Sequence, residues 1–146
     1  MNIPVNKHAP VFAEDHITIA TKASDVWEVL TAIEAWPKWQ SDVSEAQLKG
    51  ALAEKTEFVW KAGGLKFRSK IHTMKQGAEF GWTGRTLGAS AIHNWTFTES
   101  KGSTTILVEE CLQGIFPSLF RKYFQKNLIL GLKKNLEELK AAAEKQ

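Results

Sequence analysis

The chain of 146 residues suits one domain, and folding at this length buries roughly 68–70% of the surface that the unfolded chain exposes. Hydrophobic residues make up 43% and charged residues 24%, which is ordinary globular usage, and the net charge is +3. The single cysteine, Cys111, excludes an intramolecular disulfide and fits a cytoplasmic protein. Residues 1–16 lack the apolar core of a signal peptide, and no stretch approaches the ~20 apolar residues of a membrane span.

The first predicted elements are a strand and two short helices. Residues 11–21 predict a strand, in which Ile17 and Ile19 share a face. Ser24 is a candidate N-cap for the helix that follows. The apolar stripe of that helix comprises Val26, Trp27, Leu30 and Ile33. Residues 34–41 predict a second short helix or turn, broken near Pro37.

Alternating segments then predict an antiparallel meander of strands joined by short turns. Residues 43–49 form a weak strand at its start. In the next three segments, the side chains that share one face are Phe58 and Trp60, then Leu65, Phe67, Ser69, Ile71 and Thr73, then Phe80, Trp82 and Gly84.

Residues 91–112 predict a hairpin with two polar side chains on its apolar face. If the turn is centred between Lys101 and Gly102, His93 lies opposite Glu110, with Cβ atoms ~4.5–5.5 Å apart. The same register makes three apolar pairs, which are Ala91 with Leu112, Trp95 with Val108, and Phe97 with Ile106. A slip of one residue would turn one strand's apolar side chains to the wrong face. His93 and Glu110 are therefore expected to be buried and within hydrogen-bond reach.

Residues 117–143 predict one long amphipathic helix with Pro117 in its first turn. Its apolar stripe comprises Phe120, Phe124, Leu128, Leu132, Leu136 and Leu139, and the first four are expected to pack across the concave face of the sheet. The predicted fold class is α+β, with a curved antiparallel sheet of about six to seven strands wrapped on this helix. The chain is expected to form a single domain over residues 1–146.

Several segments resemble the START/polyketide-cyclase/plant-allergen superfamily, SRPBCC, and within it the bacterial polyketide cyclase/dehydrase-like branch. They are Val26–Trp27, Trp36–Pro37 with Trp39, and residues 80–88, 92–97 and 109–114. The resemblance implies a helix-grip fold around a cavity, with two short helices after the first strand. This superfamily includes lipid carriers, cyclases, hydroxylase subunits and co-chaperones, so the resemblance specifies the fold and leaves the activity open. Cys111 and Leu112 depart from the common form of the last motif.

The first functional hypothesis is binding of a small hydrophobic or aromatic ligand, lipid- or polyketide-like, by a carrier or sensor. The cavity is expected to hold on the order of 300–1,000 Å³. Its expected walls are Trp39, Phe58, Trp60, Phe67, Ile71, Phe80, Trp82, His93, Trp95, Phe97, Val108, Glu110, Phe120, Phe124 and Leu128.

His93 and Glu110 have three interpretations that the sequence leaves open. They are a buried pair that fixes the strand register, a polar anchor for a ligand, or an acid/base pair of a cyclase or dehydratase. The last makes the chain an enzyme, which is the alternative function. A second alternative is a co-chaperone-like interaction module.

Other candidate sites receive less support. His8, His16 and His72 have no metal-ligand spacing, and strand parity predicts that His16 and His72 are exposed. Arg68 and Arg85 alternate with the residues of the concave face, so their side chains are expected to point to the opposite side of the sheet. No metal, cofactor or nucleic acid is expected, nor integral membrane association. The basic residues of 121–126 and 133–134 are interpreted as a solvated helix face, with a weak phosphate or anionic-lipid footprint as the alternative.

Overall fold

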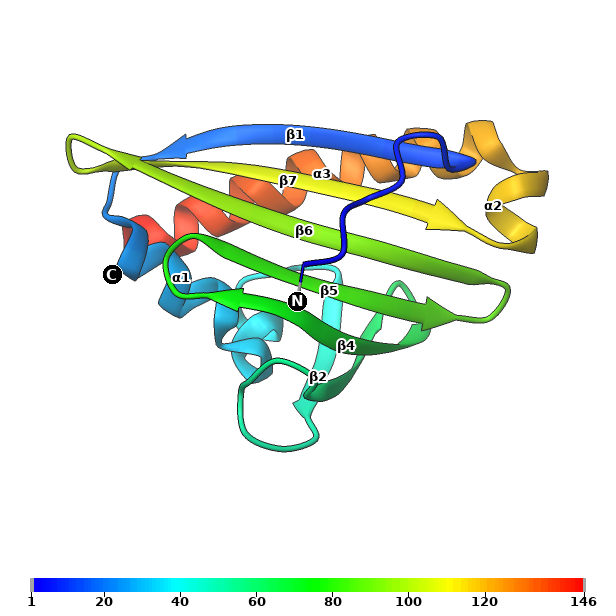
Figure 1. Ribbon diagram of the computed structural model, residues 1–146, viewed down its shortest axis with the longest axis horizontal. Coiled ribbons are helices and arrows are strands. Elements are labelled where there is room, and N and C mark those ends of the chain that lie inside the picture. The colour runs from blue at the N-terminus through cyan, green and yellow to red at the C-terminus, as the bar shows by residue number, and fades with distance from the viewer. Residues whose placement is uncertain (1, 146) are drawn as a thin grey trace.

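The computed structural model describes residues 2–145 and contains one curved antiparallel sheet with helices on its concave face (Figure 1). Within these residues, seven strands lie in the order β1-β7-β6-β5-β4-β3-β2. The strands are β1 Val11–Ile19, β2 Val43–Leu48, β3 Glu57–Ala62, β4 Leu65–Lys75, β5 Glu79–Thr86, β6 Ala89–Ser100 and β7 Ser103–Gln113. The helices are α1 Ala23–Thr31, the 3-10 helix η1 Ile33–Lys38, α2 Ile115–Leu119 and α3 Arg121–Glu144.

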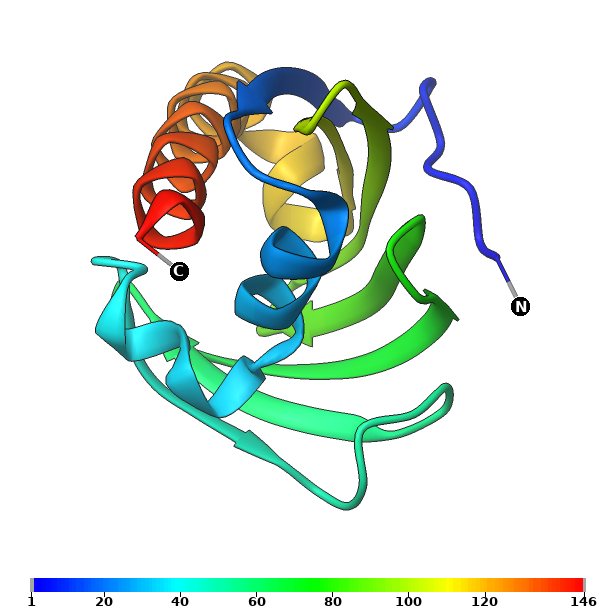
Figure 2. The same ribbon diagram turned by 90° about the vertical axis from the view of Figure 1, so that its left-hand side faces the viewer.

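The sheet curls around α1 and α3, as Figure 2 shows. Alternate strand side chains point to this concave side and meet the apolar stripes of the two helices, because a curved sheet cannot bury its apolar face alone. Buried residues shared by sheet and helices include Ile19, Val26, Leu30, Phe58, Ile71, Ile106, Leu132, Leu136 and Leu139. This is the α+β helix-grip architecture that the resemblance implied.

The register of the β6–β7 hairpin is the predicted one. Trp95 pairs with Val108, and His93 pairs with Glu110. The apolar alternation of both strands was sufficient to place this pair, since a slipped register would expose one strand's apolar side chains.

The start of α1 differs from the prediction, because Ser24 lies inside the helix and Lys22 takes the N-cap position. The Lys22 side chain makes no capping hydrogen bond. Instead, the carboxylate of Glu99 on β6 accepts a hydrogen bond of 2.7 Å from the backbone N–H of Ala23. A distant carboxylate thus performs the task that the local sequence suggested for Ser24.

His72 is buried, with 8% exposure, so the expectation of an exposed His72 is wrong. The register of β4 against β5 shifts between Ile71 and Thr73, and this irregularity turns Thr73 to the convex side of the sheet. There, the N-terminal segment covers the histidine, and Ile3 N donates to His72 Nδ1 at 3.2 Å. Gly81 leaves the room, since a Cβ there would lie 2.5 Å from the imidazole Cε1. His16, in contrast, is exposed as expected.

The predicted single C-terminal helix is divided at Phe120 into α2 and α3. α2 is tied to the β5–β6 turn, where Phe116 N donates to Gly88 O at 3.2 Å, whereas α3 packs along β1. The chain changes direction between these two docking sites. As a result, Leu132 is buried and Leu128 half-buried against the sheet, but Phe120 is 55% exposed and does not pack across the concave face.

Candidate ligand-binding cavity

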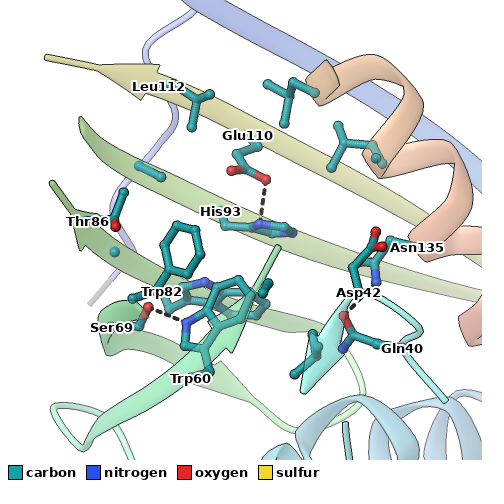
Figure 3. A pocket seen from close by; sticks show the side chains of 18 of the residues that line it. Gln40, Asp42, Trp60, Ser69, Trp82, Thr86, His93, Glu110, Leu112 and Asn135 are labelled. Carbon is teal, nitrogen blue, oxygen red and sulfur yellow. Dashed lines mark hydrogen bonds and ion pairs between the residues drawn. The ribbon is translucent and has the colours of Figure 1, made fainter. Parts of the chain in front are cut away.

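A cavity of about 250 Å³ lies between the concave face of the sheet and α3. Its volume falls slightly below the range expected from the sequence. Aromatic rings form one wall, small and apolar side chains from β5, β6 and β7 form its end, and α3 forms the opposite wall. These three groups are Trp36, Trp60, Phe67 and Trp82; Thr86, Ala89, Ala91 and Leu112; and Asn127, Leu128, Gly131, Leu132 and Asn135 (Figure 3).

Two of the aromatic rings have fixed orientations. Trp60 stacks on Phe67 with ring centroids 4.6 Å apart, and its indole Nε1–H donates to Ser69 Oγ at 3.0 Å. Gly84 on the next strand makes room for this hydroxyl, because a Cβ at Gly84 would lie 3.0 Å from it. The result is a rigid, flat surface that suits a planar ligand.

His93 and Glu110 face each other within the cavity wall. His93 Nδ1 lies 2.7 Å from Glu110 Oε1, and the two side chains are only 12% and 15% exposed. Both line the cavity, and Figure 3 shows Glu110 reaching down to the edge of the imidazole ring. At this distance the two atoms share a hydrogen bond, so a proton lies between them.

The imidazole ring of His93 is held between two indoles. Its centroid lies 4.4 Å from that of Trp82 and 5.2 Å from that of Trp95, and the interplanar angle is 19° in both cases. Its Nε2 atom is buried and has no hydrogen-bond partner within residues 2–145, and the same is true of Trp95 Nε1. Buried polar atoms are usually paired, and of these two residues only His93 lines the cavity, so its Nε2 marks a place where a polar atom of another molecule would be favoured.

Polar side chains join the loop after η1 to α3 beside the cavity. Asn135 Nδ2 donates to Gln40 Oε1 at 2.8 Å, and Lys134 Nζ donates to Asp42 Oδ1 at 3.0 Å. The hydrogen bond from Lys134 to the Asp42 carboxylate raises the pKa of the lysine. Since Gln40, Asp42 and Asn135 also line the cavity, these contacts close one side of it.

The structure places six of the fifteen residues expected in the cavity on its wall: Trp60, Phe67, Trp82, His93, Glu110 and Leu128. Another six are core residues: Phe58, Ile71, Phe80, Trp95, Phe97 and Val108. They are core because α1 and η1 fill that part of the concave face. Trp27 contacts Phe80 and Phe97, and Trp36 contacts Phe58.

The three remaining expected residues also lie away from the cavity. Trp39 is half-buried and packs against the core. Phe120 is exposed at the break between α2 and α3, and Phe124 is half-buried beside Tyr123. The cavity is therefore smaller than the apolar face on which it was predicted.

Sequence reasoning missed the polar wall on α3. Asn127, Asn135 and Glu138 recur at helical spacing along one flank of the apolar stripe, with Gly131 between them, and all four residues line the cavity. That spacing was a usable signal. Arg85 is exposed and has convex-face parity, as expected, although it also borders the end of the cavity near the β5–β6 turn.

No three His, Cys, Asp or Glu side chains between residues 2 and 145 come together in a way that could hold a metal ion. Over the same range, none of the helices has the length and apolar character needed to cross a membrane.

A family model described as "Polyketide cyclase / dehydrase and lipid transport" matches residues 11–144. No curated protein sequence matches the chain. Among solved structures, a hypothetical protein of Helicobacter pylori is similar with a TM-score of 0.84 and 16% identity, over 94% of this chain and 90% of that one. The Zhui aromatase/cyclase of a Streptomyces species has a TM-score of 0.82 and 12% identity, over 92% and 93%. A START superfamily protein of Mycobacterium smegmatis has a TM-score of 0.72 and 12% identity, over 92% and 94%. At these identities the likeness concerns the fold.

Proposed function

The chain belongs to the polyketide cyclase/dehydrase and lipid-transport family, and we propose that it binds a small hydrophobic or aromatic ligand in the cavity between the sheet and α3. The observation that carries this proposal is the cavity itself, with a flat aromatic wall and one buried polar pair. Ligand sites typically combine many apolar groups with a few convergent polar ones.

The size of the cavity restricts the ligand. A protein cavity of about 150 Å³ holds one benzene ring, so 250 Å³ accommodates one or two rings rather than an extended polycyclic molecule. A larger ligand would require the contacts between the 40–42 loop and α3 to open. The ligand is expected to carry a hydroxyl or carbonyl group that reaches His93, because Nε2 of this ring is buried without a partner among the described residues.

Native mass spectrometry of freshly purified protein tests the proposal, together with quenching of tryptophan fluorescence by two-ring phenols and ketones. Ala91 lines the cavity, and Ala91→Phe should fill it and reduce affinity at least tenfold. Ile92→Phe is the matched control, since Ile92, next to the cavity-facing His93 on the same strand, points to the convex face and does not line the cavity. Equal affinities for the two variants would place binding elsewhere. A folded protein that binds none of these compounds and retains none would instead favour an interaction module.

The hydrogen-bonded pair also supports a second function, a cyclase- or dehydratase-type enzyme. In such a reaction, Nε2 of His93 would accept a proton from the ligand, and the Glu110 carboxylate would stabilise the imidazolium that forms. Glu110→Gln separates the two functions. The amide preserves the shape of the site and the hydrogen bond but not the charge, so an enzyme should lose turnover with little loss of affinity, whereas a carrier has no turnover to lose.

A further inference from the structure

α2 and the β5–β6 turn lie together at one end of the molecule (Figure 1), and exposed apolar side chains extend from there along α3. We call this group the α2–α3 surface, and its members are Leu87, Ile115, Phe116, Leu119, Phe120, Tyr123, Ile129 and Leu130. Leu87 is 83% exposed and Leu119 68%. Scattered exposed apolar residues are ordinary in soluble proteins, but a group gathered on one short helix, the first three turns of α3 and an adjacent loop indicates an interaction site.

The charge around this surface has one sign. Residues 111–136 contain no aspartate or glutamate, but they contain five basic residues: Arg121, Lys122, Lys126, Lys133 and Lys134. Helical spacing puts Lys122, Tyr123 and Lys126 on the outer side of α3, and Ile129, Leu130 and Lys133 continue that side. Within residues 2–145, Arg121, Lys122 and Lys126 have no ion-pair partner.

We propose that the α2–α3 surface docks on anionic lipid membranes. Aromatic and aliphatic side chains that alternate with lysine and arginine on an exposed helix are the pattern of interfacial membrane-binding segments. The apolar side chains would enter the headgroup region, while the basic ones, beside them on the same helix, would contact lipid phosphates.

A second copy of the chain is a poorer occupant. A symmetric contact through the α2–α3 surface would bring the basic residues of both copies together, and like charges repel. An acidic protein would satisfy the charge, but the most exposed apolar side chains stand on a loop and a short helix at the tip of the molecule. Protruding residues suit insertion into a lipid layer better than the flat packing of a protein interface.

The location of the surface gives docking a consequence for the cavity. Thr86 and Ala89, which flank the turn that carries Leu87, line the cavity, as does Leu112 just before α2. A membrane at the α2–α3 surface would thus lie against one end of the cavity, where an apolar ligand could pass between lipid and protein. This consequence depends on the proposed function, whereas the docking does not.

Flotation of the intact chain with vesicles tests the docking. The vesicles consist of phosphatidylcholine alone, or of phosphatidylcholine mixed with phosphatidylglycerol. The chain should float only with the vesicles that contain phosphatidylglycerol. Added salt should release it, because screening weakens the attraction between the basic side chains and the lipid phosphates. Each basic residue near an anionic surface raises the partition coefficient onto the membrane about fivefold. The triple variant Arg121→Gln, Lys122→Gln and Lys126→Gln should therefore weaken binding roughly 100-fold.

The matched control is the triple variant Lys66→Gln, Arg68→Gln and Lys70→Gln, which removes the same net charge from the exposed side of β4. It should bind nearly as the original chain does. Leu119→Ser with Phe120→Ser should also reduce binding, and because both side chains are exposed the variant should stay folded by circular dichroism. The proposal is wrong if the chain floats with neither kind of vesicle, or if both triple variants lose binding equally. It is also wrong if vesicle binding is absent and the substitutions on the α2–α3 surface instead abolish self-association or binding to an acidic protein.

Discussion

Replacing Glu110 by leucine removes the acceptor that holds His93 and leaves a buried Nδ1 without a partner. The hydrogen bond is 2.7 Å long, and both side chains are more than four-fifths buried. An unsatisfied buried polar group costs ~1–3 kcal/mol. Because some water reaches the cavity side of the pair, we expect the free energy of unfolding to fall by ~1–2 kcal/mol. For a chain near this size, the melting temperature should fall by about 2–4 °C for each kcal/mol.

A double-mutant cycle isolates this contribution. His93→Phe removes the other partner and keeps a ring between Trp82 and Trp95. In that background, Glu110→Leu should cost little, since an apolar residue then meets an apolar ring. Glu110→Gln alone should cost less than about 1 kcal/mol, because the amide oxygen can still accept the hydrogen bond.

Urea unfolding followed by circular dichroism measures all four proteins, and an unchanged slope against urea shows that the folded and unfolded states keep their surface areas. An equal loss of stability from Glu110→Leu with and without His93 would show that the pair does not contribute this energy. Equal stabilities of the leucine and glutamine variants would likewise show that the hydrogen bond contributes nothing specific.

Three further predictions concern the scaffold. Gly81→Ala should lower the free energy of unfolding by ~1–3 kcal/mol in urea unfolding, because the new methyl group would overlap the His72 ring, and an unchanged midpoint would contradict the observed approach. Glu99→Ala removes the cap of α1 and should cost ~1 kcal/mol in the same assay, while a neutral result would mean that water replaces the cap fully. Hydrogen bonds from the Lys140 ammonium and a backbone N–H lower the pKa of Glu144, so its contribution to stability is present above the pKa of the unfolded chain and is lost as pH falls through the folded value. Titration of the Glu144 carboxyl by NMR checks this, and a pKa at or above the ordinary value for glutamate would contradict it.

The sequence by itself determined the architecture and the pair at the site. Period-two alternation in β6 and β7 specified their register, because any slip would expose the apolar side chains of one strand. The spacing of Leu128, Leu132 and Leu136 likewise specified which side of the C-terminal helix meets the sheet. Both features follow from a local period and an apolar surface that must be covered.

Tertiary structure decided the extent of the cavity. Phe58 and Phe97 have the parity of cavity residues, yet they are core residues because Trp36 and Trp27 reach them from the short helices. The hydrophobic period of a strand or helix indicates on which face a side chain lies, but it does not indicate which distant segment covers that face. The area left open depends on the docking of α1 and η1.

The same limit explains His72 and Phe120. His72 lies on the convex face, as its parity predicts, but the N-terminal segment covers it in place of solvent. An irregularity in β4 reverses the parity of the residues after His72, so that Thr73 also faces this segment. The division of the C-terminal helix at Phe120 follows from two docking sites, the β5–β6 turn for α2 and β1 for α3. Contacts between segments far apart in the chain decided both features, and no local pattern of residues carries that information.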